Sequence, residues 1–286
     1  MSPGFGAWLF AGSAVASAVG GTLGMASGIF IVPILIALGV NIHAAVAASL
    51  VSVIACSCGS AAPFLEGNLT NIRVAIVLET ATTLGALTGV LLAGVLAVPF
   101  LLFLFAAILL VSAWQMMARR RESVAAAEDA NLRDWATALR LHSSYPDQAL
   151  GRDVHYRVRR VPLGLMLMFG AGLISALLGI GSGVLKIPAM DTALRLPIKV
   201  SSATSNFMIG VTAAASAAAY FARGDIDPAI AGPVALGSVL GALLGARLLM
   251  AVSGERLRLV FVAVLIALAA QMLFSAITVH AGAHAT

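Results

Sequence analysis

Residues 178–190 read LGIGSGVLKIPAM, and residues 23–35 read LGMASGIFIVPIL, a weaker copy of the same pattern. Both stretches place small residues about halfway along an apolar block of about 34 residues, at 161–194 and 7–40. As one straight α-helix, such a block would be about 51 Å long. The hydrocarbon core of a bilayer is only about 30 Å thick. In a membrane, each block must therefore break at its glycines, either as a kinked span with a protruding tail or as a hairpin that turns back.

The composition excludes a soluble globular enzyme. Of the 286 residues, 60% are apolar and 10% are charged, against roughly 45–50% and about 25% in ordinary soluble domains. The 17 Lys and Arg and 12 Asp and Glu residues are too few to cover a core of this size with a polar surface. The lipid bilayer is the solvent that suits such a chain. The net charge of +5 is typical of basic cytoplasmic loops, so we expect no nucleic-acid partner.

Eight apolar blocks follow one another along the chain, which predicts an all-α polytopic membrane fold. Four lie before and four after a polar stretch, residues 119–160, that holds 9 of the 17 basic and 6 of the 12 acidic residues. We therefore divide the chain into a first transmembrane repeat at 1–118, a cytoplasmic linker at 119–160 and a second transmembrane repeat at 161–286. Within the linker, Ser123 to Leu141 indicates a short amphipathic helix. The blocks are 7–40, 44–65, 72–98, 99–118, 161–194, 200–221, 229–252 and 257–280.

The two halves of the chain are similar in sequence. At an offset of 155 residues the glycine clusters superpose, and at an offset of 156 the tetrapeptide LGAL at 84–87 falls on LGAL at 240–243. The order of matches is kept over about 95 residues, and we interpret the halves as an internal repeat. The pairs at the first offset are Gly24 and Gly179, Ser27 and Ser182, Gly28 and Gly183, Pro33 and Pro188, and Ala48 and Ala203.

The glycine-rich stretch of the second half is followed by ATSN at 203–206, and its copy in the first half is followed by AAS at 47–49. This pattern resembles the TauE/SafE family of membrane transporters, also called the sulfite exporter family. The resemblance covers nearly the whole chain apart from 119–160, and it is weaker in the first half, where Met25 and Ala26 replace the usual small or glycine residues.

The resemblance implies a multi-pass protein of the bacterial inner membrane that is not an enzyme. It implies secondary transport, and export in particular, of a small sulfur-containing anion such as sulfite or an organosulfonate, driven by an ion gradient. An anion channel, or a transporter of another small anion such as a carboxylate or thiosulfate, is the alternative. The expected partners are the anion and the bilayer, and assembly into a homo-oligomer is left open.

Basic residues favour a hairpin in each long block. Lys and Arg concentrate in cytoplasmic loops, so the arginine-rich 119–160 stretch is expected on the cytoplasmic side. With two hairpins, the other loop cations except Arg223 also lie on that side, whereas single crossings would place most of them outside. Each half then has an odd number of crossings, so the halves are inverted and both termini lie outside, as in many secondary transporters. The cations that hairpins place inside are Arg73, Arg195, Lys199, Arg247, Arg256 and Arg258.

We expect the anion to bind at the broken helices. A helix that begins after a glycine cluster presents free backbone N–H groups and a positive dipole end, which suit an oxyanion. Hydroxyl and amide side chains on the following span add hydrogen-bond donors without a second charge. The alternative is that the small residues permit close helix packing and the polar ones bond between helices. The candidate substrate-binding residues are Gly24, Ser27, Gly28, Ser49, Gly179, Gly181, Ser182, Gly183, Lys186, Thr204 and Asn206.

Two charged residues inside apolar blocks are candidates for the transport chemistry. Lys186 is costly in a membrane segment and is expected to pair with Asp191 or with the anion, unless it extends to a nearby interface. Glu79, which has no acidic counterpart in the second half, is the candidate proton-coupling residue. Its alternative role is that of a structural acid close to Arg73.

Other chemistry is not indicated by the sequence. The five histidines are scattered through loops and termini, and Cys56 and Cys58 form an isolated C-x-C, so we expect neither a metal site nor a cofactor. The chain has no Walker-type phosphate loop, so active transport would have to use an ion gradient or an external partner.

Overall fold

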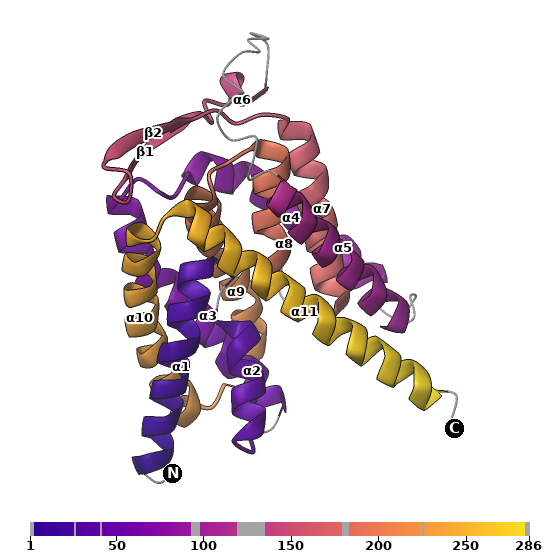
Figure 1. The fold of residues 1–286 in the computed structure, drawn as a ribbon. Coiled ribbons are helices and arrows are strands. Elements are labelled where there is room, and N and C mark those ends of the chain that lie inside the picture. The colour runs from indigo at the N-terminus through magenta and orange to yellow at the C-terminus, as the bar shows by residue number, and fades with distance from the viewer. Residues whose placement is uncertain are drawn as a thin grey trace. The chain divides into compact units, whose positions relative to one another are not determined.

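The computed structural model describes residues 3–25, 27–40, 42–92, 98–118, 135–178, 183–222, 224 and 226–283. Helices dominate this part of the chain, and five of them are long and apolar enough to cross a membrane, namely α1, α3, α4, α10 and α11. This confirms the prediction of a multi-pass helical membrane protein. The helices are α1 (Pro3–Leu23), α2 (Gly28–Ala37), α3 (Ile42–Glu66), α4 (Ile72–Leu92), α5 (Val98–Ala118), α6 (Trp135–Ala138), α7 (Val161–Leu178), α8 (Gly183–Ala189), α9 (Ile198–Ala222), α10 (Pro228–Ala251) and α11 (Gly254–Ala283), as labelled in Figure 1.

The linker departs from the all-helical prediction. Two short strands, β1 (Ser143–Asp147) and β2 (Arg152–Tyr156), pair in a hairpin that the sequence analysis did not predict. Pro146 and the two serines of β1 give no strand-like alternation, which is why the pattern was missed. Of the helix expected over Ser123 to Leu141, α6 is the described part, since residues 119–134 lie outside the described residues.

The first long block is a helical hairpin. α1 ends at Leu23, and α2 begins at Gly28 and runs back along α1, so that Ile34 lies against Gly12. Gly24 has a positive φ of 72°, and a Cβ there would fall within 2.9 Å of the Ser202 backbone. Glycine is needed at this turn because any other residue would be strained by the positive φ, and its Cβ would overlap the Ser202 backbone.

The second long block also turns back on itself. α7 ends at Leu178, α8 begins at Gly183, and a π-helical segment, η2 (Met190–Leu194), continues α8. The Arg159 N–H, just before α7, donates to the Leu194 carbonyl at 3.1 Å. The start of α7 and the end of η2 are therefore adjacent, and the hairpin alternative describes both long blocks.

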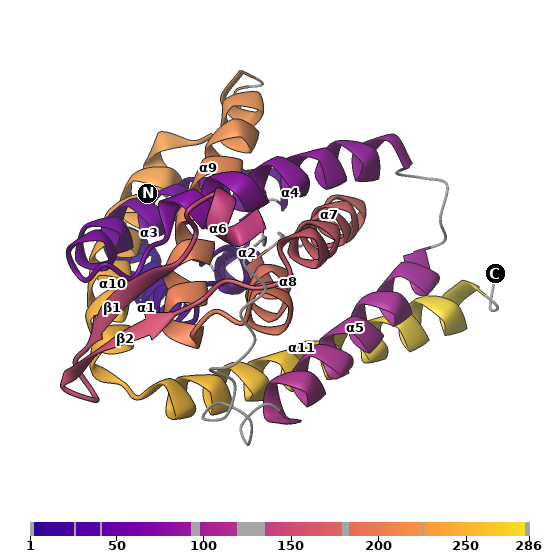
Figure 2. The same ribbon diagram turned by 90° about the horizontal axis from the view of Figure 1, so that it is seen from above.

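The helices fall into two compact units, each built from both halves of the sequence. One unit contains Met1–Ala75, Ser143–His155 and Lys199–Ser253, and the other contains Ile76–His142, Tyr156–Ile198 and Gly254–Thr286. In the first unit, hereafter the α1 unit, α10 packs against both α1 and α3. In the second, hereafter the α7 unit, α5 and α11 lie side by side (Figures 1 and 2).

Glycines allow close helix approach inside each unit. In the α1 unit, a Cβ added at Gly241 or Gly245 of α10 would overlap the backbone of α1 at Ala14 or Ala18. In the α7 unit, a Cβ at Gly85 of α4 would overlap the α7 backbone at Phe169. Small residues let helix backbones approach closely, which strengthens van der Waals packing where lipid gives no hydrophobic driving force.

Candidate functional site

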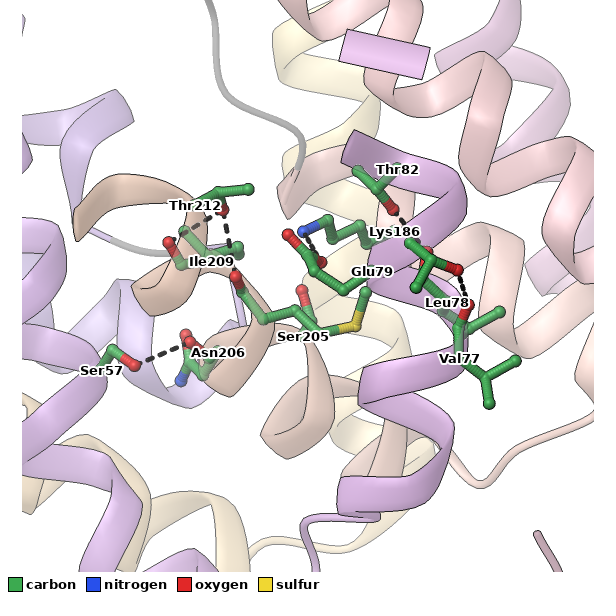
Figure 3. A network of polar contacts seen from close by, with 12 residues as sticks. Ser57, Val77, Leu78, Glu79, Thr82, Lys186, Ser205, Asn206, Ile209 and Thr212 are labelled. Carbon is green, nitrogen blue, oxygen red and sulfur yellow. Dashed lines mark hydrogen bonds and ion pairs between the residues drawn. The ribbon is translucent and has the colours of Figure 1, made fainter. Parts of the chain in front are cut away.

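Lys186 lies on α8, the short returning helix of the second hairpin. All seven residues of α8 are buried, and the Lys186 side chain is 0% exposed. Its ammonium group, Nζ, donates to Glu79 Oε2 on α4 at 2.9 Å (Figure 3), and both residues belong to the α7 unit. The alternative that Lys186 extends to the interface is therefore wrong. The two charged residues singled out in the sequence form one ion pair.

The partner of Lys186 differs from the acid named first in the sequence analysis. Asp191 lies on η2, where its Oδ1 accepts from Arg258 of α11 at 2.9 Å. Asp191 follows Lys186 by five residues, a spacing that does not place two side chains together on a helix face, since neighbours are three or four apart. Glu79 is 107 residues away in sequence, and only the packing of α8 near α4 brings it to Lys186.

The Glu79–Lys186 pair is buried but incompletely satisfied. The Glu79 side chain is 15% exposed, and Glu79 Oε1 is buried with no hydrogen-bond partner in the described part of the chain. A buried carboxylate oxygen without a donor is costly. The Lys186 ammonium therefore binds one oxygen of the Glu79 carboxylate, and the second oxygen, Oε1, can accept a further hydrogen bond.

The break between α1 and α2 is held by side chains of α9. Asn206 Nδ2 donates to the Gly21 carbonyl at 2.9 Å, and Ser205 Oγ donates to the Gly24 carbonyl at 2.8 Å. These carbonyls lie at the C-terminal end of α1, where a helix leaves acceptors unsatisfied. This geometry is the interhelical bonding that the sequence analysis gave as the alternative for Asn206. Ser205 also takes part, although it was not among the candidates.

Three buried hydroxyls form a chain in the α1 unit. Ser27 Oγ and Ser238 Oγ each lie 2.6 Å from Ser52 Oγ, which joins the start of α2 to α3 and α10. The sequence pointed to Ser27, but Ser238 was missed because it is hidden in the glycine-rich run of α10. The two other hydroxyl candidates of this unit also have partners. Ser49 donates to the Val46 carbonyl within α3, and Thr204 of α9 accepts from the Asn71 N–H, 133 residues away in sequence.

The glycine candidates are only partly described. Gly28 and Gly183 begin α2 and α8, as expected of residues that open a returning helix. Gly179, Gly181 and Ser182 lie outside the described residues. The candidates of the first hairpin and of α9 belong to the α1 unit, whereas Gly183, Lys186 and Glu79 belong to the α7 unit.

The linker contributes a second buried ion pair, in the α1 unit. Lys199 Nζ, at the start of α9, donates to Asp147 Oδ1 of β1 at 2.8 Å and to the Met250 carbonyl near the end of α10 at 3.1 Å. Tyr145 and the Ala149 N–H also donate to Asp147. Burial alone would raise the pKa of Asp147, but the hydrogen bond and charge of Lys199 outweigh it and hold this pKa below its ordinary value of 3.8.

Broken helical hairpins and a buried ion pair inside a multi-pass helical membrane protein are typical of secondary transporters. The sequence profile of the family described as Sulfite exporter TauE/SafE matches residues 9–272. The chain belongs to the TauE/SafE family of membrane transporters.

A relative with a similar sequence is also described as a membrane transporter. The chain is 28% identical over 115 residues to a protein of Bacillus subtilis (strain 168) described as "Probable membrane transporter protein YunE". The matched segment spans 40% of this chain and 42% of the relative, less than half the length of each. No solved structure matches the chain.

Proposed function

We propose that the protein is a secondary transporter that exports a small sulfur-containing anion, such as sulfite or an organosulfonate, across the bacterial inner membrane under an ion gradient. The observation that carries this proposal is Lys186, a fully buried cation on the returning helix of a membrane hairpin. A buried ammonium group attracts an anion that enters the protein, and Glu79 beside it is an acid that can take up a proton. Family membership supports transport of this anion class.

Within this proposal, the glycine breaks and Lys186 hold the anion. In the α7 unit, Ser182 orients it beside Lys186. In the α1 unit, at the break between α1 and α2, the residues proposed to orient an anion are Ser27, Thr204 and Asn206, and Ser49 adds a hydroxyl. Asn206 and Ser27 fit such a role because each has hydrogen-bonding capacity beyond the bond that it makes in this conformation. Glu79 is the proton-coupling residue.

The proposal includes an internal repeat with inverted halves. It is supported by matching contacts at aligned positions, since Gly241 meets Ala14 in the α1 unit and Gly85 meets Phe169 in the α7 unit. Gly85 aligns with Gly241 at the offset of 156, and Ala14 aligns with Phe169 at the offset of 155. Two similar halves that exchange conformations give alternating access to a central site.

Flux into proteoliposomes tests the proposed function. Purified protein is screened with sulfite, sulfoacetate, taurine, thiosulfate and carboxylates, with and without a pH gradient. We expect sulfite or an organosulfonate to move, to show counterflow and to respond to the gradient. An anion channel would show neither counterflow nor gradient dependence, and transport of carboxylates alone would overturn the substrate class.

A matched pair of variants locates the site. Lys186→Ala is expected to abolish flux, because it removes the buried cation. Arg247→Met also removes one positive charge, but from an exposed position on α10, and it should keep flux near the wild-type rate. Equal flux in the two variants would contradict a role for Lys186.

A further inference from the structure

The Glu79–Lys186 pair has no net charge, and this constrains what can bind there. Lys186 is fully buried and Glu79 is 15% exposed, so a net charge at this place would be poorly solvated. The Glu79 carboxylate already neutralises the ammonium group that an incoming anion needs. An anion therefore competes with Glu79 for this cation, and the Glu79 carboxylate remains in the same buried region in either case.

We infer that the substrate anion and a proton bind together at this pair: one monovalent anion replaces the Glu79 carboxylate at Lys186, and Glu79 takes up one proton, a step that we call the exchange. The balance is Glu79 carboxylate paired with Lys186 ammonium, plus a proton and an anion, giving Glu79 carboxylic acid and Lys186 ammonium paired with the anion. The pair is neutral before and after the exchange. This inference rests on the proposed function, and it adds the charge of the substrate and the number of protons. A carrier that moves both together is electroneutral, so the anion gradient and the proton gradient together set the direction, and export requires an outward anion gradient larger than any inward proton gradient.

The same charge count disfavours the other combinations. A monovalent anion that binds without a proton leaves the pair with one excess negative charge, and so does a divalent anion that binds with one proton. Uncompensated buried charge is strongly destabilising, because the free energy lost on removing the charge from water is not offset by attraction to an opposite charge. The site therefore selects monovalent anions over divalent ones of similar chemistry.

In the described part of the chain, Glu79 is the acid that pairs with the Lys186 ammonium, at 2.9 Å. The other buried acid on a neighbouring element of the α7 unit, Asp191 of η2, is bound to Arg258 of α11. In addition, Glu79 Oε1 has no described hydrogen-bond partner, so a proton has a carboxylate oxygen available.

Binding calorimetry on the full-length protein in nanodiscs tests the exchange. The probes are isethionate, a sulfonate of fixed single charge, and ethane-1,2-disulfonate, a sulfonate of fixed double charge. Titrations in buffers with different ionisation enthalpies count the protons taken up. We expect one proton to be taken up per isethionate bound. The affinity for isethionate should therefore fall about tenfold for each unit by which the pH rises, as long as Glu79 and Lys186 form an ion pair before the anion arrives. The disulfonate should bind much more weakly.

Glu79→Gln should bind isethionate without proton uptake and with an affinity independent of pH, because the amide mimics the protonated acid. Glu255→Gln removes an exposed carboxylate in the first turn of α11 and should keep the uptake of one proton. Proton uptake that persists in Glu79→Gln would overturn the inference.

The wild-type titrations give an independent test that needs no variant. Isethionate bound without a proton, or disulfonate bound as tightly as isethionate, would overturn the exchange while leaving sulfonate transport intact. Wild-type protein that binds neither these probes nor sulfite would overturn the proposed substrate class and the exchange with it.

Discussion

Lys186, on α8, is a charged residue in an apolar segment, and such a residue is unfavourable in a membrane protein unless its charge is compensated. Placing a lysine at the centre of a membrane helix costs about 2.5–3.5 kcal/mol on insertion scales. In the folded protein, Lys186 Nζ lies 2.9 Å from Glu79 Oε2, and this hydrogen bond together with the opposite charge of Glu79 offsets the unfavourable free energy. Stability at this place therefore depends on the pair, and loss of one partner leaves the other as an uncompensated buried charge.

Lys186→Met is expected to lower the free energy of unfolding by about 3–5 kcal/mol, because Glu79 is left as a buried acid without its cation. The double variant Lys186→Met with Glu79→Gln removes both charges and should recover most of this loss. Unfolding in mixed micelles with a denaturing detergent measures the difference. A double variant as unstable as the single one would contradict an energetic coupling between the two side chains.

At the scale of elements, close contacts between helices depend on glycines spaced four residues apart. Gly237, Gly241 and Gly245 lie on one face of α10, and that face meets the α1 backbone. Thr22 strengthens the last of these contacts by donating to the Gly245 carbonyl at 3.1 Å. Elsewhere on the same helix, Gly232 has no atom within 4 Å of the place that a Cβ would take.

Gly241→Ala should therefore destabilise the protein by about 1–3 kcal/mol, the usual cost of overpacking. The matched control is Gly232→Ala, for which we expect no loss and a gain of up to about 1 kcal/mol from helix propensity. The same detergent unfolding assay compares the two. Equal effects of both substitutions would mean that the α1–α10 approach tolerates a methyl group.

The linker hairpin is the element whose attachment should depend on pH. The pKa of Asp147 is lower in the folded state than its ordinary value of 3.8, so the stabilisation by Lys199 is fully present above that value and is lost as the pH falls through the depressed folded-state pKa. Hydrogen exchange of the Ala149 amide, which donates to Asp147, reports on this attachment.

We expect its protection to decrease at acid pH in the wild-type protein. Asp147→Asn should exchange faster already at neutral pH and lose the acid-dependent step. A step of unchanged size in this variant would assign the titration to another group.

At the scale of the whole molecule, the sequence predicted what depends on length and local pattern. Both long blocks had to break because about 34 residues exceed the bilayer core, and the positive φ at Gly24 explains why glycine occupies the first turn. Contacts between distant segments were not predictable in this way. The pairing of Lys186 with Glu79, the bonding of Asn206 to Gly21 and the docking of Asp147 on Lys199 all depend on tertiary packing, which leaves no mark on local periodicity.

The proposed inverted topology makes a prediction for the whole chain. Inside the α1 unit, Lys199 and Met250 meet the linker hairpin, so α9 starts and α10 ends on the linker side. Inside the α7 unit, Arg258 reaches the Met116 carbonyl near the end of α5, the helix that leads into the linker. These contacts support a cytoplasmic position for Lys199 and Arg258, as the hairpin arrangement requires.

Single cysteines test this arrangement in a background without Cys56 and Cys58. A maleimide that cannot cross the membrane should label Thr286→Cys in intact cells, because three crossings after the linker bring the C-terminal end outside. It should label Arg256→Cys and Arg152→Cys only after the membrane is opened, since the proposed hairpin arrangement puts both on the cytoplasmic side. Labelling of Arg256→Cys in intact cells, together with protection of Thr286→Cys, would require an even number of crossings in the second half, and the two halves would then share one orientation.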